Sequence, residues 1–269
     1  MHHATAALTR LSHYSSVLAI AICASALTVS AQLAPVKPGV YRWSDHTVQA
    51  DSNRETRAIL EGTSPHLSFL KIHATTQPVG AQPRPARAND DAEELIIVKE
   101  GLLKMTFDNH SEVLAAGSVV HLMPGQMHQI ANVGDVPLTY YVMKYRSEKP
   151  MQLERATASG ASRMFDVTKL PLKPSARGAG RAYFDRATAM CERFELHVTQ
   201  LHQSGPSHAP HSHVESEIIL VISGDTEMSI DGKDYKGSAG DFYLVPSNQP
   251  HGLRNLSDKP CAYFAFKWK

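Results

Sequence analysis

The sequence has almost no excess charge, few cysteines and only one long apolar run. Its 27 Lys and Arg residues nearly balance 26 Asp and Glu residues, which leaves a formal net charge of +1. Binding to nucleic acid without sequence preference needs a surplus of positive charge, so this balance argues against a nucleic-acid partner. With 269 residues, of which 42% are hydrophobic and 20% charged, the chain is typical of a folded protein and long enough for two domains.

The one long apolar run lies near the N-terminus. Residues 17–29 carry no charge and follow a weakly basic stretch that contains Arg10. The run is shorter than the roughly 20 residues of a membrane span, and compact residues, Val29 and Ala31, precede a plausible cleavage point. We therefore expect residues 1–31 to be a signal peptide of a protein exported to the periplasm or secreted. An uncleaved N-terminal anchor is the alternative, and we expect no membrane span after Ala31.

Cysteine is scarce, and cleavage after Ala31 would reduce it further. The three cysteines of the chain would become two, Cys191 and Cys261, because Cys23 lies in the predicted signal peptide. In an exported protein these two can form a disulfide bridge. Two buried free thiols are an equal alternative, because free cysteine often packs as a small apolar residue.

The rest of the chain contains one internal repeat. At an offset of 123 residues, identical residues recur without a gap from residue 94 to residue 144. The recurring pairs include Glu94 and Glu217, Gly101 and Gly224, Gly117 and Gly240, His128 and His251, Tyr140 and Tyr263, and Lys144 and Lys267. Upstream the offset is 125, where Phe69 corresponds to Phe194 and Gly80 to Gly205. The chain therefore contains two copies of one domain.

Each copy has the pattern of short β-strands. Residues 95–98 and 218–222 are apolar runs rich in branched side chains, and each is followed by a glycine. Asp231 and Gly232 form a two-residue hairpin signal between two further short runs. Many short strands with such turns predict an all-β fold, with a closed antiparallel barrel or jelly roll in each copy, because closure removes exposed sheet edges.

The repeat also sets the expected domain boundaries. We place the first barrel at residues 32–150 and the second at residues 181–269. Residues 151–180 are polar, contain prolines and lack a sustained period, so we expect them to be a linker. Two barrels in one chain can pair with each other, so a monomer with an internal pseudo-dimer and a homodimer are both expected.

The second copy carries a set of potential metal ligands. His211 and His213 are two residues apart and point to the same face if they lie on a strand, and Glu217 keeps that parity. His251 comes from a separate strand. Three imidazoles and one carboxylate suit a divalent transition ion, which leaves open positions for water, oxygen or substrate if the ion takes about six ligands. We predict one such site, with Mn, Fe, Ni, Cu or Zn as candidates. The alternative is that these are surface or packing residues.

The first copy departs from this pattern. Counting at the constant offset places Ala88 and Asp90 opposite the two histidines of the His-x-His pair, and a count from the upstream glycine gives two alanines. Glu94 and His128 are retained, and with Asp90 they would form at best a weak, oxygen-rich site. We favour a metal-free barrel that supports folding, pairing or pocket shape, because a metal site needs three or four convergent ligands.

The motifs of the second copy resemble a known superfamily. Residues 205–224 resemble the first motif of the cupin superfamily without a mismatch, and residues 240–255 resemble the second, with Asn248 where a glycine is usual. The similarity extends over both halves, so the chain looks like a bicupin. The resemblance implies one small jelly-roll barrel per half and a metal inside the second barrel, held by His211, His213, Glu217 and His251. It does not select a reaction, because the superfamily includes dioxygenases, decarboxylases, isomerases, aminohydrolases, storage proteins and sensors.

Further residues are candidates to line the pocket or to orient a ligand. They are Gln200, His202, His208, Tyr243 and, with either face of its strand possible, His197. The leading hypothesis is an exported metal-dependent enzyme that acts on a small oxygenated molecule. The alternatives are a protein that binds a carbohydrate or another small ligand without turnover, and a structural bicupin whose metal stabilises the fold.

Overall fold

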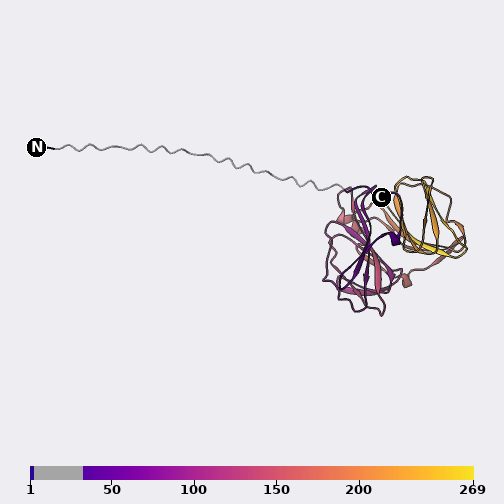
Figure 1. The fold of residues 1–269 in the computed structure, drawn as a ribbon, viewed down its shortest axis with the longest axis horizontal. Helices are drawn as coiled ribbons and strands as arrows, with labels where there is room; N and C mark the ends of the chain where they lie inside the picture. The colour runs from indigo at the N-terminus through magenta and orange to yellow at the C-terminus, as the bar shows by residue number, and fades with distance from the viewer. Residues whose placement is uncertain (3–32) are drawn as a thin grey trace. The chain divides into compact units, whose positions relative to one another are not determined.

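The structure, a computed structural model, describes residues 1–2 and 33–269. Apart from its first two residues, the predicted signal peptide with its cleavage site lies outside the described residues. Within the described part, no helix is long and apolar enough to cross a membrane. From residue 33 onward the chain is predominantly antiparallel β-structure, which Figure 1 traces from indigo and magenta in the first barrel to orange and yellow in the second.

The first barrel is formed by two antiparallel sheets that face each other. The larger sheet has the order β11-β8-β5-β10-β4-β3-β2, and the smaller has the order β7-β6-β9. Their strands are β2 (Val48–Ala50), β3 (Glu55–Ser64), β4 (Leu67–Gln77), β5 (Glu93–Glu100), β6 (Leu102–Phe107), β7 (His110–Ala115), β8 (Val119–Leu122), β9 (His128–Asn132), β10 (Leu138–Ser147) and β11 (Arg163–Phe165). Apolar side chains from both sheets, such as Val142 and Ile130, fill the space between them.

The second barrel repeats this arrangement. Its sheets have the orders β1-β19-β16-β21-β14-β13-β12 and β15-β20-β17-β18. Their strands are β1 (Gly39–Tyr41), β12 (Lys173–Ser175), β13 (Gly178–Arg186), β14 (Phe194–Leu201), β15 (Gly205–Pro206), β16 (Ser216–Ser223), β17 (Thr226–Ile230), β18 (Lys233–Gly237), β19 (Phe242–Val245), β20 (His251–Asn255) and β21 (Cys261–Trp268). The predicted hairpin is confirmed between β17 and β18, where Asp231 and Gly232 adopt φ angles of 49° and 76°.

The apolar runs of β5 and β16 are continuous because both faces of these strands are buried. In β16, Ile219 and Val221 pack inside the second barrel, whereas Ile218 and Leu220 pack in a core shared with the first barrel. The strand β5 divides its side chains in the same way. A strand that is covered on both sides shows no polar alternation, which explains the sequence pattern.

The shared core holds the two barrels together. Its largest side chains, Tyr145, Phe194, Phe264, Phe266 and Trp268, come from both barrels and are 2% exposed or less. Burial of a side chain of this size contributes about 1.5–3 kcal/mol each, so the pairing of the barrels is a substantial part of the stability of the chain.

The segment predicted as a linker has structure of its own. Residues 151–180 contain the helix α1 (Leu153–Ala158), the strand β11, the short 3-10 helix η2 (Val167–Lys169) and the strand β12. A further 3-10 helix, η1 (Trp43–Asp45), follows β1. The two strands of the segment join the sheets of the barrels, so the segment also contributes to the barrel sheets.

Each half of the chain gives one strand to the barrel of the other half. The strand β1, near the start of the described chain, pairs with β19 of the second barrel. The strand β11, which follows the last strand of the first barrel, pairs with β8 of that barrel. Because β8 and β19 are equivalent in the repeat, the exchange is reciprocal.

The two cysteines of the described chain are not bridged. Cys191 and Cys261 are both buried and free. The free-thiol alternative is confirmed, and the disulfide alternative is wrong. Cys191 packs in the shared core and Cys261 in the core of the second barrel, so each acts as a small apolar residue.

Candidate metal centre

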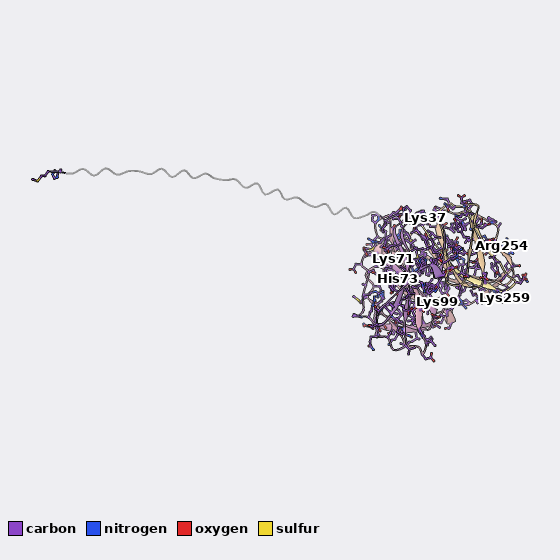
Figure 2. The ribbon with its side chains drawn as sticks, in the orientation of Figure 1. Lys37, Lys71, His73, Lys99, Arg254 and Lys259 are labelled. Atoms are coloured by element: carbon purple, nitrogen blue, oxygen red, sulfur yellow. The ribbon has the colours of Figure 1, made fainter. Side chains whose placement is uncertain are left out.

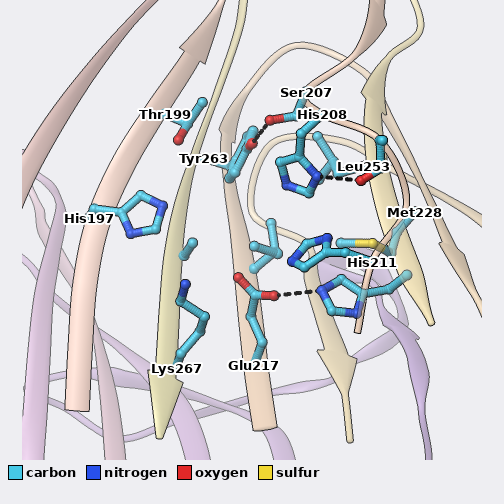
Figure 3. Close-up of a pocket in the computed structure, with 14 residues that line it drawn as sticks. His197, Thr199, Ser207, His208, His211, Glu217, Met228, Leu253, Tyr263 and Lys267 are labelled. Carbon is cyan, nitrogen blue, oxygen red and sulfur yellow. Dashed lines mark hydrogen bonds and ion pairs between the residues drawn. The ribbon is translucent and has the colours of Figure 1, made fainter. Parts of the chain in front are cut away.

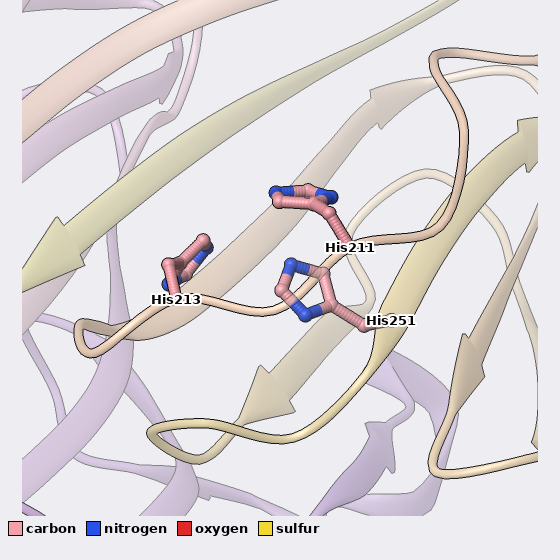
Figure 4. Close-up of side chains that lie close together, drawn as sticks. All are labelled: His211, His213 and His251. Atoms are coloured by element: carbon pink, nitrogen blue, oxygen red, sulfur yellow. The ribbon is translucent and has the colours of Figure 1, made fainter.

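Three imidazoles of the second barrel converge on one point (Figure 4). The ligand nitrogens of His211, His213 and His251 all lie within 4.8 Å of one another. His251 is the first residue of β20, and its backbone exchanges two hydrogen bonds of 3.0 and 2.8 Å with His211. His211 and His213 lie in the segment before β16 and not on a continuous strand, so strand parity does not apply to them. The backbone bridge between His211 and His251 brings those two imidazoles together.

Backbone carbonyls fix the orientation of two of the rings. His213 Nδ1 lies 2.9 Å from the carbonyl oxygen of Glu215, and His251 Nδ1 lies 2.9 Å from that of Gln249. A ring that donates its Nδ1 proton to a carbonyl presents the lone pair of Nε2 on its other side. The Nε2 atoms of His213 and His251 are buried, and among the described residues neither makes a contact with the geometry of a hydrogen bond. Buried ring nitrogens without a partner are costly, and this cost disappears when a cation occupies the point they face.

Glu217, on β16, adds an anionic oxygen to the cluster. Its Oε2 atom lies 3.0 Å from His251 Nε2 and 3.4 Å from His213 Nε2. Burial alone would raise the pKa of Glu217, but the adjacent side chains of His213 and His251 lower it to about 2. The pKa of His211 is lowered, first by burial and then by the neighbouring imidazoles. The cluster therefore combines an ionised carboxylate with one imidazole, His211, that favours its neutral, metal-binding form, whereas the contact with Glu217 raises the pKa of His213.

A cavity of about 460 Å³ opens beside the cluster (Figure 3). Figure 3 shows His197 and Lys267 on one side of this cavity, His208 and His211 on the other, and Glu217 between them. Tyr263 and Ser207 share a hydrogen bond of 2.8 Å between their hydroxyls in the wall. The apolar part of the wall consists of Ala209, Ile219, Met228, Leu253 and Ala265. The cluster is therefore accessible to a small molecule.

The predictions for residues near the pocket have mixed outcomes. His197 and His208 line the cavity. Gln200 does not, because it lies on the opposite face of β14 from Thr199 and lines a separate cavity between the barrels. His202 is exposed beyond the end of β14. Tyr243 is fully buried, and its hydroxyl donates to the carbonyl of Thr226.

Sequence reasoning missed four polar residues of the wall. They are Thr199, Ser207, Tyr263 and Lys267. Tyr263 and Lys267 are both identical between the two copies of the repeat, and they lie four residues apart on β21, so strand parity places them on the same face. Identity between the two copies, together with strand parity, was the sequence signal that could have identified these two residues.

Lys267 is held at the side of the cavity by an ion-pair network. Its Nζ atom lies 3.2 Å from Glu195 Oε2. Glu195 also lies 2.6 Å from Arg193 and 3.0 Å from His197. The contact with His197 and the positive charge of Lys267 lower the pKa of Glu195 to about 2 against the opposing effect of burial, so this carboxylate stays ionised.

The cupin domain family matches residues 74–144 and 197–267, which together make up more than half of the chain. The chain belongs to the cupin family. One match lies in each barrel, and the two end at Lys144 and Lys267, which are equivalent in the repeat, so both barrels are cupin domains and the chain is a bicupin.

Individual relatives support the same fold. H2HPP isomerase from Bacillus subtilis is 41% identical over 51 residues, which is 19% of this chain and only 22% of that protein. AerE from Microcystis aeruginosa superposes with a TM-score of 0.64 at 12% identity, over 86% of this chain and 99% of that one. Oxalate decarboxylase from Bacillus subtilis, a protein with Mn(II) centres, gives a TM-score of 0.64 at 14% identity, over 86% of this chain and 77% of that one.

Asn248, where the second cupin motif usually has glycine, keeps the backbone of a glycine. Its φ angle is +63°, and its backbone N–H donates a hydrogen bond of 2.8 Å to the carbonyl oxygen of His213. Gly125 occupies the equivalent place in the first barrel with a φ angle of +79°. Asparagine tolerates this left-handed conformation better than most residues, so the substitution preserves the loop that positions His213.

The first cupin barrel has an arginine and an asparagine at the places of two imidazoles of the second. The backbone of Arg87 exchanges hydrogen bonds of 3.0 and 2.9 Å with His128, so Arg87 occupies the place of His211. The carbonyl of Asn89 accepts from Gly125 at 2.7 Å, so Asn89 occupies the place of His213. The correspondence with Ala88 and Asp90 is wrong by one residue, because the first barrel has one extra residue between Asn89 and Glu94.

The retained glutamate of this barrel is neutralised by protein cations. Glu94 is 1% exposed and lies 2.9 Å from Lys144, 3.7 Å from His128 and 3.9 Å from Arg87. Lys144 also donates to Asn89 at 3.2 Å. Asp90 is exposed. Asn89 occupies the position in the cluster that was predicted for Asp90.

Proposed function

We propose that this cupin binds one divalent transition metal ion in its second barrel and acts as a metal-dependent enzyme on a small oxygenated molecule. The ligands would be His211, His213, Glu217 and His251. The observation that carries the proposal is the convergence of three imidazoles within 4.8 Å of one another beside the carboxylate of Glu217, which lies 3.0 Å from His251 Nε2 and 3.4 Å from His213 Nε2. When bound, the ion would polarise an oxygen atom of the substrate.

The residues of the chain provide the rest of the site. The carbonyls of Glu215 and Gln249 keep two imidazoles in one orientation, so the ligand set is arranged before the ion arrives. The cavity beside the ligands leaves room for a substrate, which distinguishes the site from a closed structural one. Mn, Fe, Ni, Cu and Zn all remain candidates for this ligand set, and Mn(II) is the first to test because a structural relative has Mn(II) centres.

Elemental analysis of the purified protein tests the metal site. The two barrels offer a matched pair of variants, since His251 and His128 are equivalent in the repeat. We expect about one equivalent of metal per chain in the wild type and in His128→Ala, and little in His251→Ala. Two equivalents in the wild type, or loss of metal in His128→Ala, would show that the first barrel also binds metal. A wild type that stays empty after loading with each of the five ions would contradict the proposal.

Turnover separates an enzyme from a protein that only binds. The metal-loaded protein should convert a member of a panel of small oxygenated molecules, screened as oxidation, decarboxylation, isomerisation and hydrolysis, and His251→Ala should not. Stoichiometric binding without product would favour the alternative of a non-catalytic ligand-binding bicupin.

We also propose that the protein is exported. The support is the charge-free run at residues 17–29 with compact residues before position 32. Mass spectrometry of the protein recovered from the periplasm or the medium of its host should find an N-terminus at residue 32. An intact N-terminus on a cell-associated protein would contradict cleavage.

A further inference from the structure

The last strand of each barrel carries a lysine at the same position. Lys267 lies on β21 and Lys144 on β10, and the repeat makes them equivalent. The neighbouring strand differs opposite each of them. Lys267 pairs in register with Glu195 of β14, whereas Lys144 pairs in register with Lys71 of β4. One lysine therefore has a carboxylate beside it, and the other has a second lysine.

In the first barrel, the lysine turns to the buried glutamate of the barrel interior. Lys71, labelled in Figure 2, is partly exposed and forms an ion pair of 2.6 Å with Glu61. With a like charge opposite it, Lys144 lies 2.9 Å from Glu94, inside the cluster that corresponds to the metal ligands. Its ammonium group supplies the positive charge that a metal ion would supply.

In the second barrel, the equivalent lysine is held away from the equivalent glutamate. Lys267 lies 3.2 Å from Glu195, and in the part of the chain that the structure describes it forms no ion pair with Glu217. Glu195 is in turn 2.6 Å from Arg193, so a second cation shares its charge. Because Arg193 shares the charge of Glu195, this carboxylate does not fully neutralise the ammonium group of Lys267, which lines the cavity.

Building on the metal site proposed above, we propose that Lys267 anchors a carboxylate group of the substrate and that Glu195 positions it. The substrate class is a small organic acid with a second oxygen group that reaches the cluster of His211, Glu217 and His251. Glu195 keeps the Lys267 ammonium off Glu217, which leaves Glu217 free for the metal ion. The opposite arrangement of Lys144 shows what happens when no carboxylate is present at the position of Glu195.

The walls of the cavity fit this class of substrate. Lys267 and His197 lie on one side and His211 on the other, as Figure 3 shows, so a bound molecule meets polar groups at both ends. Ile219 and Leu253 add apolar surface to the wall of the cavity for a short carbon chain. An ammonium group in a partly enclosed cavity binds a carboxylate more strongly than an uncharged amide of the same shape.

Succinate and its uncharged counterpart succinamide are suitable probes, measured by calorimetry on the Mn(II)-loaded protein. We expect the wild type to prefer succinate. Lys267→Met should keep one equivalent of Mn(II) and lose about 10- to 100-fold in succinate affinity. Lys267→Arg should restore most of it, and Lys71→Met, a change at a partly exposed lysine of the first barrel, should have no effect. Equal affinity for both probes in the wild type, or unchanged succinate affinity in Lys267→Met, would overturn the anchoring role.

The positioning role of Glu195 has a separate readout, the affinity for Mn(II) without any substrate. Glu195→Gln should lower this affinity by about tenfold, because Lys267 is then free to pair with Glu217. The double variant Glu195→Gln/Lys267→Met should regain it, and Lys71→Gln is the matched control. Unchanged Mn(II) affinity in Glu195→Gln would overturn the positioning role. A wild type that binds no Mn(II) would instead overturn the metal site itself, and both roles with it.

Discussion

The two barrels of this bicupin share a fold and much of an interior, yet only one offers an open ligand cluster. The register of the strands makes Thr75 equivalent to Thr199 and His73 equivalent to His197, and the tyrosines of both last strands are retained. The difference lies in a few charged positions. Two imidazoles in the second barrel are replaced by Arg87 and Asn89 in the first.

The comparison shows that a cupin barrel does not need a metal ion to keep its buried glutamate. In the first barrel Lys144 and Arg87 neutralise Glu94, and in the second barrel His213 and His251 surround Glu217. A buried carboxylate needs a positive partner in either case. The protein supplies that partner itself in the first barrel, and in the second the proposed metal ion would supply it.

The largest expected effect is the loss of unfolding free energy when one of the two equivalent lysines is replaced. Lys144→Met removes the nearest cation from a carboxylate that is 1% exposed, so we expect the free energy of unfolding to fall by about 3–5 kcal/mol. Lys267→Met should cost about 1 kcal/mol, because Glu195 keeps Arg193 and is partly exposed. Urea unfolding of the metal-free variants measures both. Equal losses would mean that the two lysines do not differ in role.

A smaller effect is expected from pH. Burial, followed by the charge of Lys144, lowers the pKa of His73 to about 4, whereas the unfolded chain has the ordinary value near 6.5. The unfolded state therefore binds more protons between these values, and stability should fall as the pH drops from about 6.5 to about 4, by at most about 3 kcal/mol. In metal-free His73→Gln this part of the loss should disappear. His110→Gln, at an exposed imidazole of the same barrel, is the control, and an unchanged pH profile in His73→Gln would contradict the assignment.

The smallest expected effect is on the stabilisation by Mn(II). It tests whether an asparagine copied from the first barrel abolishes the metal site of the second. At a free Mn(II) concentration of 100 times its Kd, the wild type should gain about 2.7 kcal/mol in unfolding free energy. His213→Asn, which copies Asn89 of the first barrel, should lose most of this gain. Thermal unfolding with and without Mn(II) measures it, with Asn89→Ala as the control. If His213→Asn is stabilised as much as the wild type, His213 is not a ligand.

The fold followed from the sequence because its signals are local. The branched apolar runs and the Asp231-Gly232 turn each depend on residues close together in the chain, and the repeat can be read by comparing the sequence with itself. The four predicted ligands were chosen from their spacing in the sequence, although His211 and His213 lie outside a regular strand. The structure brings three of them within 4.8 Å and places Glu217 beside them.

The rest depended on register, which the sequence does not display. The upstream offset of 125 is wrong by one, because β4 and β14 align at 124, with Leu70 and not Phe69 opposite the place of Phe194. A shift by one residue turns every side chain to the other face of a strand. Gln200 was named as a candidate without a strand face being assigned, and the register places its neighbour Thr199 at the cavity instead. The partner of Lys267 was also hidden, because Glu195 lies 72 residues away in the chain.

The reciprocal strand exchange has a consequence for the history of the chain. A cut between β10 and β11 would leave each half with a strand that completes the other half, and with an unpaired edge on β8 or β19. Two identical halves could close those edges on each other by the same geometry, because β8 and β19 are equivalent. The tandem chain is therefore the covalent form of a symmetrical, strand-swapped pair, which gene duplication produces without a new interface. Once the halves are joined, one can exchange two of its imidazoles for other side chains while the other keeps them.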